Sequence, residues 1–464
     1  YYLYFGGIFM KTRINFKDEF YQKLKLLVLP IAIQNFMLAL VSATDAIMLG
    51  WIDQTSLSAV SLAGQVQFVL SLFISGIAAG AGIMAAQYWG KQDAASIEKV
   101  IPIALRTNLL FSGLFTILAG FCPEMLMRIF TNDAALVASG SQYLRAVALS
   151  YVLCGISQVY LILLKNTGHA AVSSRISSTA VVLNIILNAI LIYGLCGAPA
   201  LGIRGAAYAT VAARVVELIW AYLETKKPER VRILWNRLFS SAGKILSEDF
   251  WRYTLPVLAA SLVWGIAYVL YSVIMGHMGS DAVAANSITS IAKSLLSCLI
   301  RGVSGGAGVL IGNLLGANEL EKAREYGRRL SHLSIAIGIV TGGLLMLISP
   351  AIVHFAPLSD TAAEYLQYML LFCGLNLMAQ SVNTTVLDGI FCAGGDAKFD
   401  MQGNIGAMWC FSVPLGFLAA FWLKLPVMVV YCIVNLDEIV KLPAVYHHYK
   451  KYIWVRNITR DVED

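Results

Sequence analysis

Long apolar segments recur twelve times along this chain, and they restrict its fold more than any other feature. A helix of about 20 apolar residues crosses the hydrocarbon core of a bilayer, where only helices and closed barrels satisfy their own backbone polar groups. Charged residues make up 13% of the chain, against about 25% in soluble domains. The sequence therefore predicts an all-α polytopic membrane protein and not a soluble enzyme. The predicted spans are residues 24–50, 57–88, 100–122, 138–164, 171–194, 203–223, 250–276, 283–313, 328–349, 362–391, 400–422 and 426–446.

The basic residues are distributed unevenly between the two sides of these spans. Of the 34 Lys and Arg residues, 27 fall on the side that includes both termini, four fall on the opposite side and three lie within spans. Loops rich in Lys and Arg stay in the cytoplasm. We therefore expect a protein of the plasma (inner) membrane with both termini cytoplasmic. The formal net charge of +7 follows from this bias and gives no reason to expect a nucleic-acid partner.

Two halves of the chain repeat at an offset of 226 residues. Pro30 recurs as Pro256, and SGIAAGAGIMAAQYWGKQD at 75–93 recurs as RGVSGGAGVLIGNLLGANE at 301–319. Because each half has six spans, both enter the membrane from the same side, and we predict two six-helix lobes related by a pseudo-two-fold axis along the membrane normal. The predicted parts are a cytoplasmic N-terminal segment (1–23), an N-lobe (24–223), a cytoplasmic amphipathic linker (224–249), a C-lobe (250–446) and a cytoplasmic tail (447–464).

The first span contains one carboxylate, Asp45, in an otherwise apolar run. An acid inside the membrane costs about 2.5–3.5 kcal/mol on insertion scales and usually faces a cavity or an ion pathway. At 1.5 Å per helical residue, Asp45, Asn188 and Thr210 all lie about 8 to 10 Å below the outer ends of their spans, and Asn184 shares a helix face with Asn188. We expect these four groups to share one pocket in the outer half of the N-lobe. The alternative is that they only hold the helices together by hydrogen bonds.

Several motifs resemble those of one transporter family. They are TDAIMLG at 44–50, AAQYWGKQD at 85–93, NIILNAILIYG at 184–194, GAAYATV at 205–211 and IGNLLGANE at 311–319. As a set, over residues 20–450, they are similar to the prokaryotic type of the MATE (multidrug and toxic compound extrusion) family, in the multidrug/oligosaccharidyl-lipid/polysaccharide flippase superfamily. The resemblance implies an antiporter that expels organic compounds and has its coupling residues on spans 1, 5 and 6. One departure is Asn188, which stands where many relatives have a second Asp and leaves Asp45 as the only acid of the pocket.

The coupling ion stays open between H⁺ and Na⁺. A single carboxylate that is dry in one conformation and hydrated in another can load and release one proton per cycle. Sodium needs several oxygen ligands, which Asp45, the two Asn carbonyls and Thr210 can supply. We favour the proton. We expect no metal site other than Na⁺ at Asp45, and no cofactor.

The C-lobe is not expected to repeat this chemistry, because Tyr271 stands at the position that corresponds to Asp45. Lys293 near the midplane must face the cleft or find a partner, and it suits an anionic group of a substrate. Arg301 and Asp388 fall toward the cytoplasmic side, where they form either a gate or a static ion pair. Pro30 and Pro256 each remove one helical hydrogen bond and are predicted hinges. The residues expected to line a substrate cavity are Gln34, Met37, Phe68, Trp264, Tyr268, Tyr271, Lys293 and Met378.

The combined prediction is a secondary active multidrug efflux antiporter that exports amphipathic, often cationic, compounds by alternating access. Its predicted partners are small-molecule amphipathic substrates and the lipid bilayer, and we expect a monomer. The rival function within the superfamily is a lipid-linked oligosaccharide or polysaccharide flippase. Lys293 and Arg301 keep that rival open, because such flippases tend to have a cationic central cavity. A membrane-embedded enzyme is disfavoured, since we find no cluster of acids and His at one depth and no Walker-type sequence.

Overall fold

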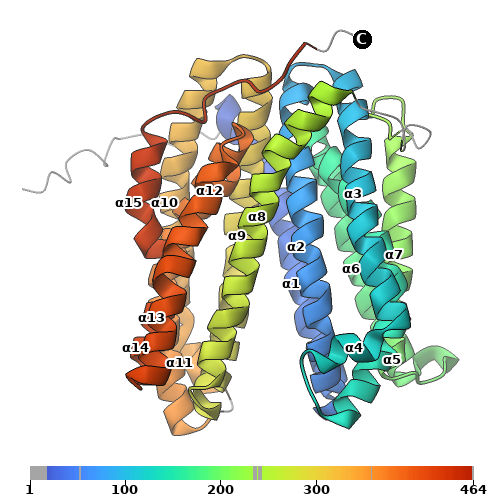
Figure 1. The fold of residues 1–464 in the computed structure, drawn as a ribbon, viewed down its shortest axis with the longest axis vertical. Coiled ribbons are helices and arrows are strands. Elements are labelled where there is room, and N and C mark those ends of the chain that lie inside the picture. Colours follow the sequence, from blue (N-terminus) through green and yellow to red (C-terminus); the bar gives the residue numbers. More distant parts are fainter. Residues whose placement is uncertain (1–17, 52–53, 234–237, 239–242, 357, 462–464) are drawn as a thin grey trace, which may run out of the picture.

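The computed structural model describes residues 18–51, 54–233, 238, 243–356 and 358–461. All regular elements within these ranges are helices (Figure 1), and ten helical segments there are long and apolar enough to cross a membrane. One of them, Ala134–Tyr193, holds two spans joined at Thr167 and Gly168, where the backbone is not helical. The last span consists of two shorter helices. With these two taken into account, the twelve predicted spans are confirmed.

The N-lobe contains helices α1 to α7, and a tight turn joins α5 to α6. Gly168 has a φ of 81°, which residues with a side chain rarely adopt, and it allows the chain to turn directly from α5 into α6. The helices are α1 (Glu19–Gly50), α2 (Gln54–Gly90), α3 (Ala94–Phe121), the short α4 (Pro123–Arg128), α5 (Ala134–Leu164), α6 (Ala170–Tyr193) and α7 (Ile203–Thr225).

The C-lobe contains helices α8 to α15, and its last three spans are irregular. A π-helical segment, Thr385–Phe391, ends the tenth span, and another, Ile405–Ser412, interrupts the eleventh. The helices are α8 (Lys244–Gly276), α9 (Ser280–Gly316), α10 (Leu320–Phe355), α11 (Asp360–Thr384), α12 (Ala397–Asn404), α13 (Val413–Phe417), α14 (Val427–Val434) and α15 (Asp437–Tyr449).

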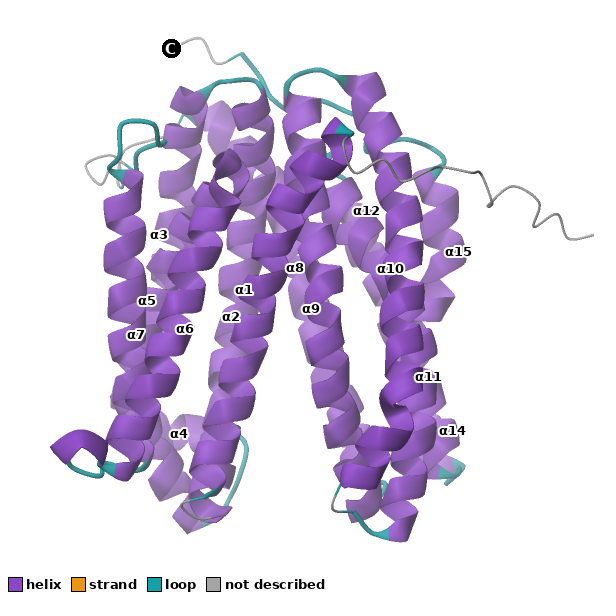
Figure 2. Ribbon diagram, turned by 180° about the vertical axis from the view of Figure 1, so that it is seen from behind, coloured by secondary structure: helices purple, strands orange, loops and turns teal. Residues whose placement is uncertain are grey.

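The two lobes meet at one end of the bundle. We call this the tail end, because residues 450–461 cross it; the opposite end is the far end. The ribbons of the two lobes come together at the tail end and diverge toward the far end (Figures 1 and 2). One hydrophobic cluster joins the lobes and includes Ile77 and Met84 of α2 with Phe250 and Leu258 of α8. The structure therefore has lobes that are packed together in the tail-end half.

The internal repeat is visible in this contact. Gly90, at the end of α2, lies against Asn313 of α9, and Gly316, at the end of α9, lies against Gln87 of α2. A Cβ on Gly90 would lie 1.9 Å from the Asn313 carbonyl oxygen, and one on Gly316 would lie 1.8 Å from that of Gln87. Glycine is required at both positions, because no side chain fits there. The two contacts are related by the same offset of 226 residues, as the predicted pseudo-two-fold axis demands.

The helices extend further than hydropathy predicts at the tail end. α1 begins at Glu19 rather than 24, because Asp18 caps it by accepting a hydrogen bond from the Phe20 backbone N–H at 3.1 Å. α8 begins at Lys244, inside the predicted linker 224–249. Residues 234–237 and 239–242 of that linker, and 1–17 of the predicted N-terminal segment, lie outside the described residues. The polar first turns explain why a search for apolar runs missed these helix starts.

Candidate functional site

The four polar residues predicted for the N-lobe are joined by hydrogen bonds. The Asn188 amide Nδ2 donates to Asp45 Oδ1 at 2.6 Å and to Asn184 Oδ1 at 3.2 Å. Asn184 Nδ2 donates to Thr210 Oγ1 at 3.3 Å, and Thr210 Oγ1 donates to the Ala206 carbonyl at 3.0 Å. We call Asp45, Asn184, Asn188 and Thr210 the N-lobe polar cluster. It connects α1, α6 and α7, which are spans 1, 5 and 6.

The cluster contains one acid and no base. Asn188 is 1% exposed and Asn184 is 5% exposed, whereas Asp45 is half-buried. Among the described residues, no Lys, Arg or His forms an ion pair with Asp45, and the buried Asn188 Oδ1 has no hydrogen-bond partner. A carboxylate that is held only by an amide, beside a carbonyl oxygen with a free lone pair, can accept a proton or a small cation.

A central cavity of about 420 Å³ lies between the lobes. Its walls come from α2, α5 and the turn after it in the N-lobe, and from α8, α9, the end of the tenth span, α12 and α15 in the C-lobe. Six of its lining residues carry charge: Lys165, Arg301, Asp388, Asp400, Glu438 and Lys441. None of the four N-lobe cluster residues lines it. The cavity and the cluster are therefore two separate sites.

Most residues predicted to line the cavity lie elsewhere. Trp264 lines it and stacks on Tyr268, with ring centroids 5.5 Å apart and an interplanar angle of 17°. Tyr268 also approaches Phe68 of the other lobe, at a centroid distance of 6.4 Å. Tyr271 is buried inside the C-lobe, and Met378 packs against Gly342 of α10. The prediction is thus corrected for these two residues, because a helical pattern gives the depth of a side chain but not its direction around the axis.

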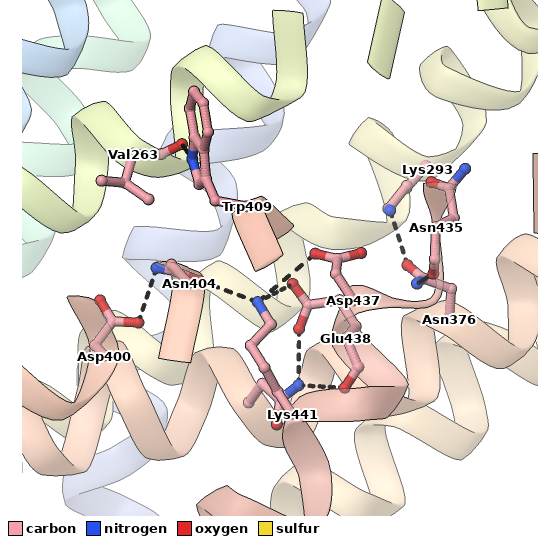
Figure 3. A network of polar contacts seen from close by, with 11 residues as sticks. Val263, Lys293, Asn376, Asp400, Asn404, Trp409, Asn435, Asp437, Glu438 and Lys441 are labelled. Carbon is pink, nitrogen blue, oxygen red and sulfur yellow. Dashed lines mark hydrogen bonds and ion pairs between the residues drawn. The ribbon is translucent and has the colours of Figure 1, made fainter. Parts of the chain in front are cut away.

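Three further residues predicted for the substrate cavity do not line the central cavity. The Lys293 ammonium does not line the cavity but donates to Asn376 Oδ1 at 2.8 Å (Figure 3). Of the two arrangements predicted for Lys293, facing the cleft or binding a partner, the structure shows the second, because Lys293 binds a polar partner inside the C-lobe. Gln34 and Met37 are half-buried on α1 and do not line the cavity.

The residues predicted as a gate reach the same cavity without pairing. Both Arg301 and Asp388 line it. No ion pair joins them within the part of the chain that the structure describes. Their role as a gate stays a prediction.

The predicted hinges lie inside unbroken helices. α1 continues through Pro30 and α8 through Pro256. The Ser174 hydroxyl of α6 donates to the Pro30 carbonyl at 2.6 Å. That bond fixes the proline turn of α1 to the helix that carries Asn184 and Asn188. Bending at these prolines stays a prediction.

A second buried polar network lies in the C-lobe and was missed by the sequence analysis (Figure 3). The Lys441 ammonium, 5% exposed, contacts Asn404 Oδ1 and Glu438 Oε1 at 3.1 Å each, and Asp437 Oδ2 at 3.7 Å. Asn404 Nδ2 in turn donates to Asp400 Oδ1 at 3.1 Å. We call Asp400, Asn404, Asp437, Glu438 and Lys441 the C-lobe polar network.

A break in the last span creates this network. α14 ends at Val434 and α15 begins at Asp437, with Asn435 between them in a non-helical conformation. The Asn376 amide Nδ2 donates to the Asn435 carbonyl at 2.7 Å, so the break leaves that oxygen satisfied. Interrupted membrane helices are tolerated where the freed backbone is buried in protein. The signal in the sequence was NLDEIVKL at 435–442, which places two acids and a Lys within an apolar run.

Two pseudo-symmetric membrane lobes with a cavity at their interface define the class of two-lobed membrane transporters. The chain belongs to the MatE family, because the sequence profile of that family matches residues 30–190 and again 256–418. The two matches start 226 residues apart, at the two repeated prolines. The family suggested by the motifs is thus confirmed.

Similar proteins cover nearly the whole chain. The probable multidrug resistance protein YoeA of Bacillus subtilis is 21% identical over 97% of this chain and 98% of its own length. The probable multidrug resistance protein NorM of Agrobacterium fabrum is 24% identical over 82% of this chain and 83% of its own length. A solved outward-facing structure of a multidrug resistance MATE family transporter superposes with a TM-score of 0.84, at 19% identity, over 93% of this chain and 95% of that one.

Proposed function

We propose that this protein is a secondary active antiporter that exports amphipathic organic compounds across the inner membrane in exchange for H⁺. The names of its relatives as multidrug resistance proteins support the substrate class. The observation that carries the coupling mechanism is the half-buried Asp45 with an amide partner and no basic partner among the described residues. Its charge is free to change during a cycle, because no neighbouring cation neutralises it.

The Asn188 amide supports a proton as the coupling ion. Asn188 Nδ2 already donates to one oxygen of Asp45, and Asn188 Oδ1 lacks a partner in the described part of the chain. A protonated Asp45 gains one O–H donor, which Asn188 Oδ1 can accept. Sodium is the alternative ion, and it would use the same oxygens as ligands.

The charge bias of the sequence supports a cytoplasmic tail end, with both chain termini on that side. The lobes are packed together there and diverge toward the far end, so this conformation corresponds to the outward-facing state of an alternating-access cycle. Uptake of the coupling ion at Asp45, with bending of α1 near Pro30, then lowers the affinity for the exported compound on the outside. A ligand shifts the two states only by its difference in affinity for them.

The second candidate function is a lipid-linked oligosaccharide flippase. Lys165 and Arg301 in the central cavity favour it, because the substrate of such a flippase carries an anionic diphosphate. A flippase of this kind moves a lipid without exporting small dyes, which separates the two candidates.

The deciding experiment is efflux from proteoliposomes. We expect the protein to move ethidium when a proton gradient is imposed, and Asp45→Asn to reduce that efflux to the level of protein-free liposomes. Asp133→Asn is the matched control, because Asp133 is exposed and Asn also caps a helix well. Wild-type efflux by Asp45→Asn would overturn the coupling role. Efflux driven only by a sodium gradient would assign the same site to Na⁺.

A further inference from the structure

Two basic side chains reach the central cavity from opposite lobes. Lys165 lies at the turn after α5 in the N-lobe, and Arg301 lies on α9 in the C-lobe. Neither makes a hydrogen bond or an ion pair with any residue in the described ranges. The third basic residue of the cavity, Lys441, differs because Glu438 and Asn404 hold its ammonium. Lys165 and Arg301 therefore have their donors available to a ligand.

Two of the three acids of the cavity are bound at Lys441 and not at this pair. Glu438 contacts Lys441 directly, and Asp400 is joined to Lys441 through Asn404. Asp388 is the one remaining acid among the lining residues. The six charged lining residues sum to zero, but two of the three acids are held at Lys441, which leaves the donors of Lys165 and Arg301 available to a ligand. Lys165 is half-buried, and a cation that is partly removed from water without a partner is costly. An anionic group beside Lys165 would therefore be stabilised.

The rest of the wall suits an apolar body. Trp264 is fixed by stacking on Tyr268, and Leu72 and Ile162 of the N-lobe line the same cavity. A volume of about 420 Å³ lies within the range of about 300–1,000 Å³ that is usual for small-molecule sites. An aromatic and aliphatic wall beside two free cations fits a compound with an apolar body and an acidic group.

We propose that Lys165 and Arg301 form a binding subsite for the acidic group of an amphipathic anion. The proposal rests on the proposed transport function and names its substrate class. An acidic group bound by both side chains would contact both lobes at once. Its binding energy then depends on how the lobes are placed, which gives the ligand different affinities for the two states.

The test is binding of a matched pair of dyes to the purified protein in nanodiscs. The probes are fluorescein, which carries a carboxylate, and ethidium, which is a cation. We expect Lys165→Gln and Arg301→Gln each to weaken fluorescein binding about ten-fold or more and to leave ethidium binding unchanged or tighter. Lys398→Gln on α12 is the control, because Lys398 is exposed and lies outside the cavity lining.

The outcomes separate this proposal from the proposed function. If both variants bind fluorescein as the wild type does, the subsite is refuted, while gradient-driven ethidium efflux continues to support an antiporter. If neither dye moves under any gradient, the antiporter fails. A polyprenyl phosphate added as a competitor distinguishes the source of the acidic group. Displacement of fluorescein by the lipid, without fluorescein transport, would assign the subsite to a lipid phosphate and refute the small-molecule assignment.

A separate observation concerns the tail segment 450–461, which ties the two lobes together. On the C-lobe, Arg456 donates to the Gly394 and Gly395 carbonyls at 2.7 and 2.6 Å, and Arg460 pairs with Asp249 at 2.8 Å. On the N-lobe, the Lys91 ammonium donates to the Arg460 carbonyl at 2.9 Å. The buried Gln87 of α2 links all parts: its Nε2 donates to the Ala393 carbonyl at 2.7 Å, and its Oε1 accepts from the Ile458 N–H at 2.9 Å.

We infer that this segment is a latch that stabilises the packed tail end. When the lobes move apart at the tail end, Gln87 and Lys91 of the N-lobe move away from the C-lobe. The segment, which contacts both lobes, must then lose its contacts with one of them. Trp454 is fully buried against Gly327 of α10, which anchors the segment to the C-lobe. The contacts that break are then those to the N-lobe.

The latch is tested by the distance between spin labels on Ala95→Cys of α3 and Glu321→Cys of α10, with the exposed Cys122, Cys196 and Cys410 replaced by Ser. Both label sites are exposed and lie near the tail end. We expect Lys91→Met with Gln87→Ala to increase the fraction of long distances several-fold, with the folded protein retained in thermal unfolding. Lys451→Met is the control, because Lys451 is an exposed cation of the same segment. Distance distributions equal to those of the control would refute the latch. If the double variant does not fold, Lys91→Met alone gives the same readout.

Discussion

The N-lobe and the C-lobe share a backbone plan but use buried charge in opposite ways. The N-lobe polar cluster has one acid and obtains its hydrogen bonds from amides. The C-lobe polar network has three acids gathered around the buried ammonium of Lys441. Glu438 and Lys441 are in direct contact, and a charge in a buried ion pair cannot be exchanged cheaply. The tethered cation thus makes the C-lobe network a fixed support, while the N-lobe cluster is left open to an ion from solution.

The largest expected effect follows from removing that tethered cation. Lys441→Met leaves Glu438 and its neighbours without a counter-charge, and breaking a buried ion pair from one side costs about 3–5 kcal/mol. We expect a loss of this size in the free energy of unfolding, measured by chemical denaturation in detergent. Lys398→Met, an exposed substitution in the same lobe, should stay within about 0.5 kcal/mol of the wild type. A neutral result for Lys441→Met would mean that the network takes up another cation.

A second substitution should recover part of that loss. In Lys441→Met with Glu438→Gln, one of the uncompensated charges is gone. Asn383 Nδ2, which donates to Glu438 Oε2 at 2.8 Å, can still donate to the amide oxygen. We expect a coupling energy of about 1–3 kcal/mol between the two sites, from the double-mutant cycle of unfolding free energies. Simple additivity would show that the two side chains do not depend on each other and would weaken the contrast between the lobes.

The same type of change in the N-lobe should barely alter stability. Asp45→Asn keeps the shape of the side chain and an oxygen that accepts from Asn188 Nδ2, and no cation loses a partner. We expect a change of less than about 1 kcal/mol in the free energy of unfolding, together with the loss of gradient-driven efflux. The opposite result would be a large loss of stability in Asp45→Asn, while the variant protein that still folds retains efflux. That result would favour a purely structural role of the cluster.

The N-lobe site was predictable from sequence, and the C-lobe network was not, for a physical reason. Asp45, Asn188 and Thr210 lie at similar depths in regular helices, so counting residues was enough to bring them together. The C-lobe network depends on the break at Asn435, and no count along an unbroken helix places Lys441 beside Asn404. The count along its helix predicts a depth for Lys293, but its direction toward Asn376 is set by packing. Repeat and hydropathy thus predict spans and lobes, while rotation about each helix axis needs coordinates.

The tail segment is attached to the two lobes by different kinds of contact. Breaking these contacts is expected to give the smallest effect of the changes considered. Its attachment to the N-lobe uses Asp461, which accepts from the Lys91 ammonium at 2.7 Å. Through Arg456 its attachment to the C-lobe uses backbone carbonyls, which do not titrate, and through Arg460 it uses the Asp249 carboxylate. The hydrogen bond and charge of Lys91 hold the pKa of the Asp461 carboxyl below its ordinary value. The ion pair therefore contributes fully at pH values above about 4 and is lost as the pH falls further.

A spin label on Thr459 can report this loss. We expect the label to become more mobile only as the pH falls below about 4, since Asp461 must take up a proton before Lys91 is released. Asp461→Asn should give a more mobile spectrum at pH 7 and remove the part of the pH dependence that comes from Asp461, and Lys91→Gln should do the same from the other side of the pair. Arg456→Gln, in contrast, should loosen the segment equally at every pH. An identical pH response in all three variants would mean that the titrating group lies elsewhere, and that the two attachments do not differ in the way the two lobes do.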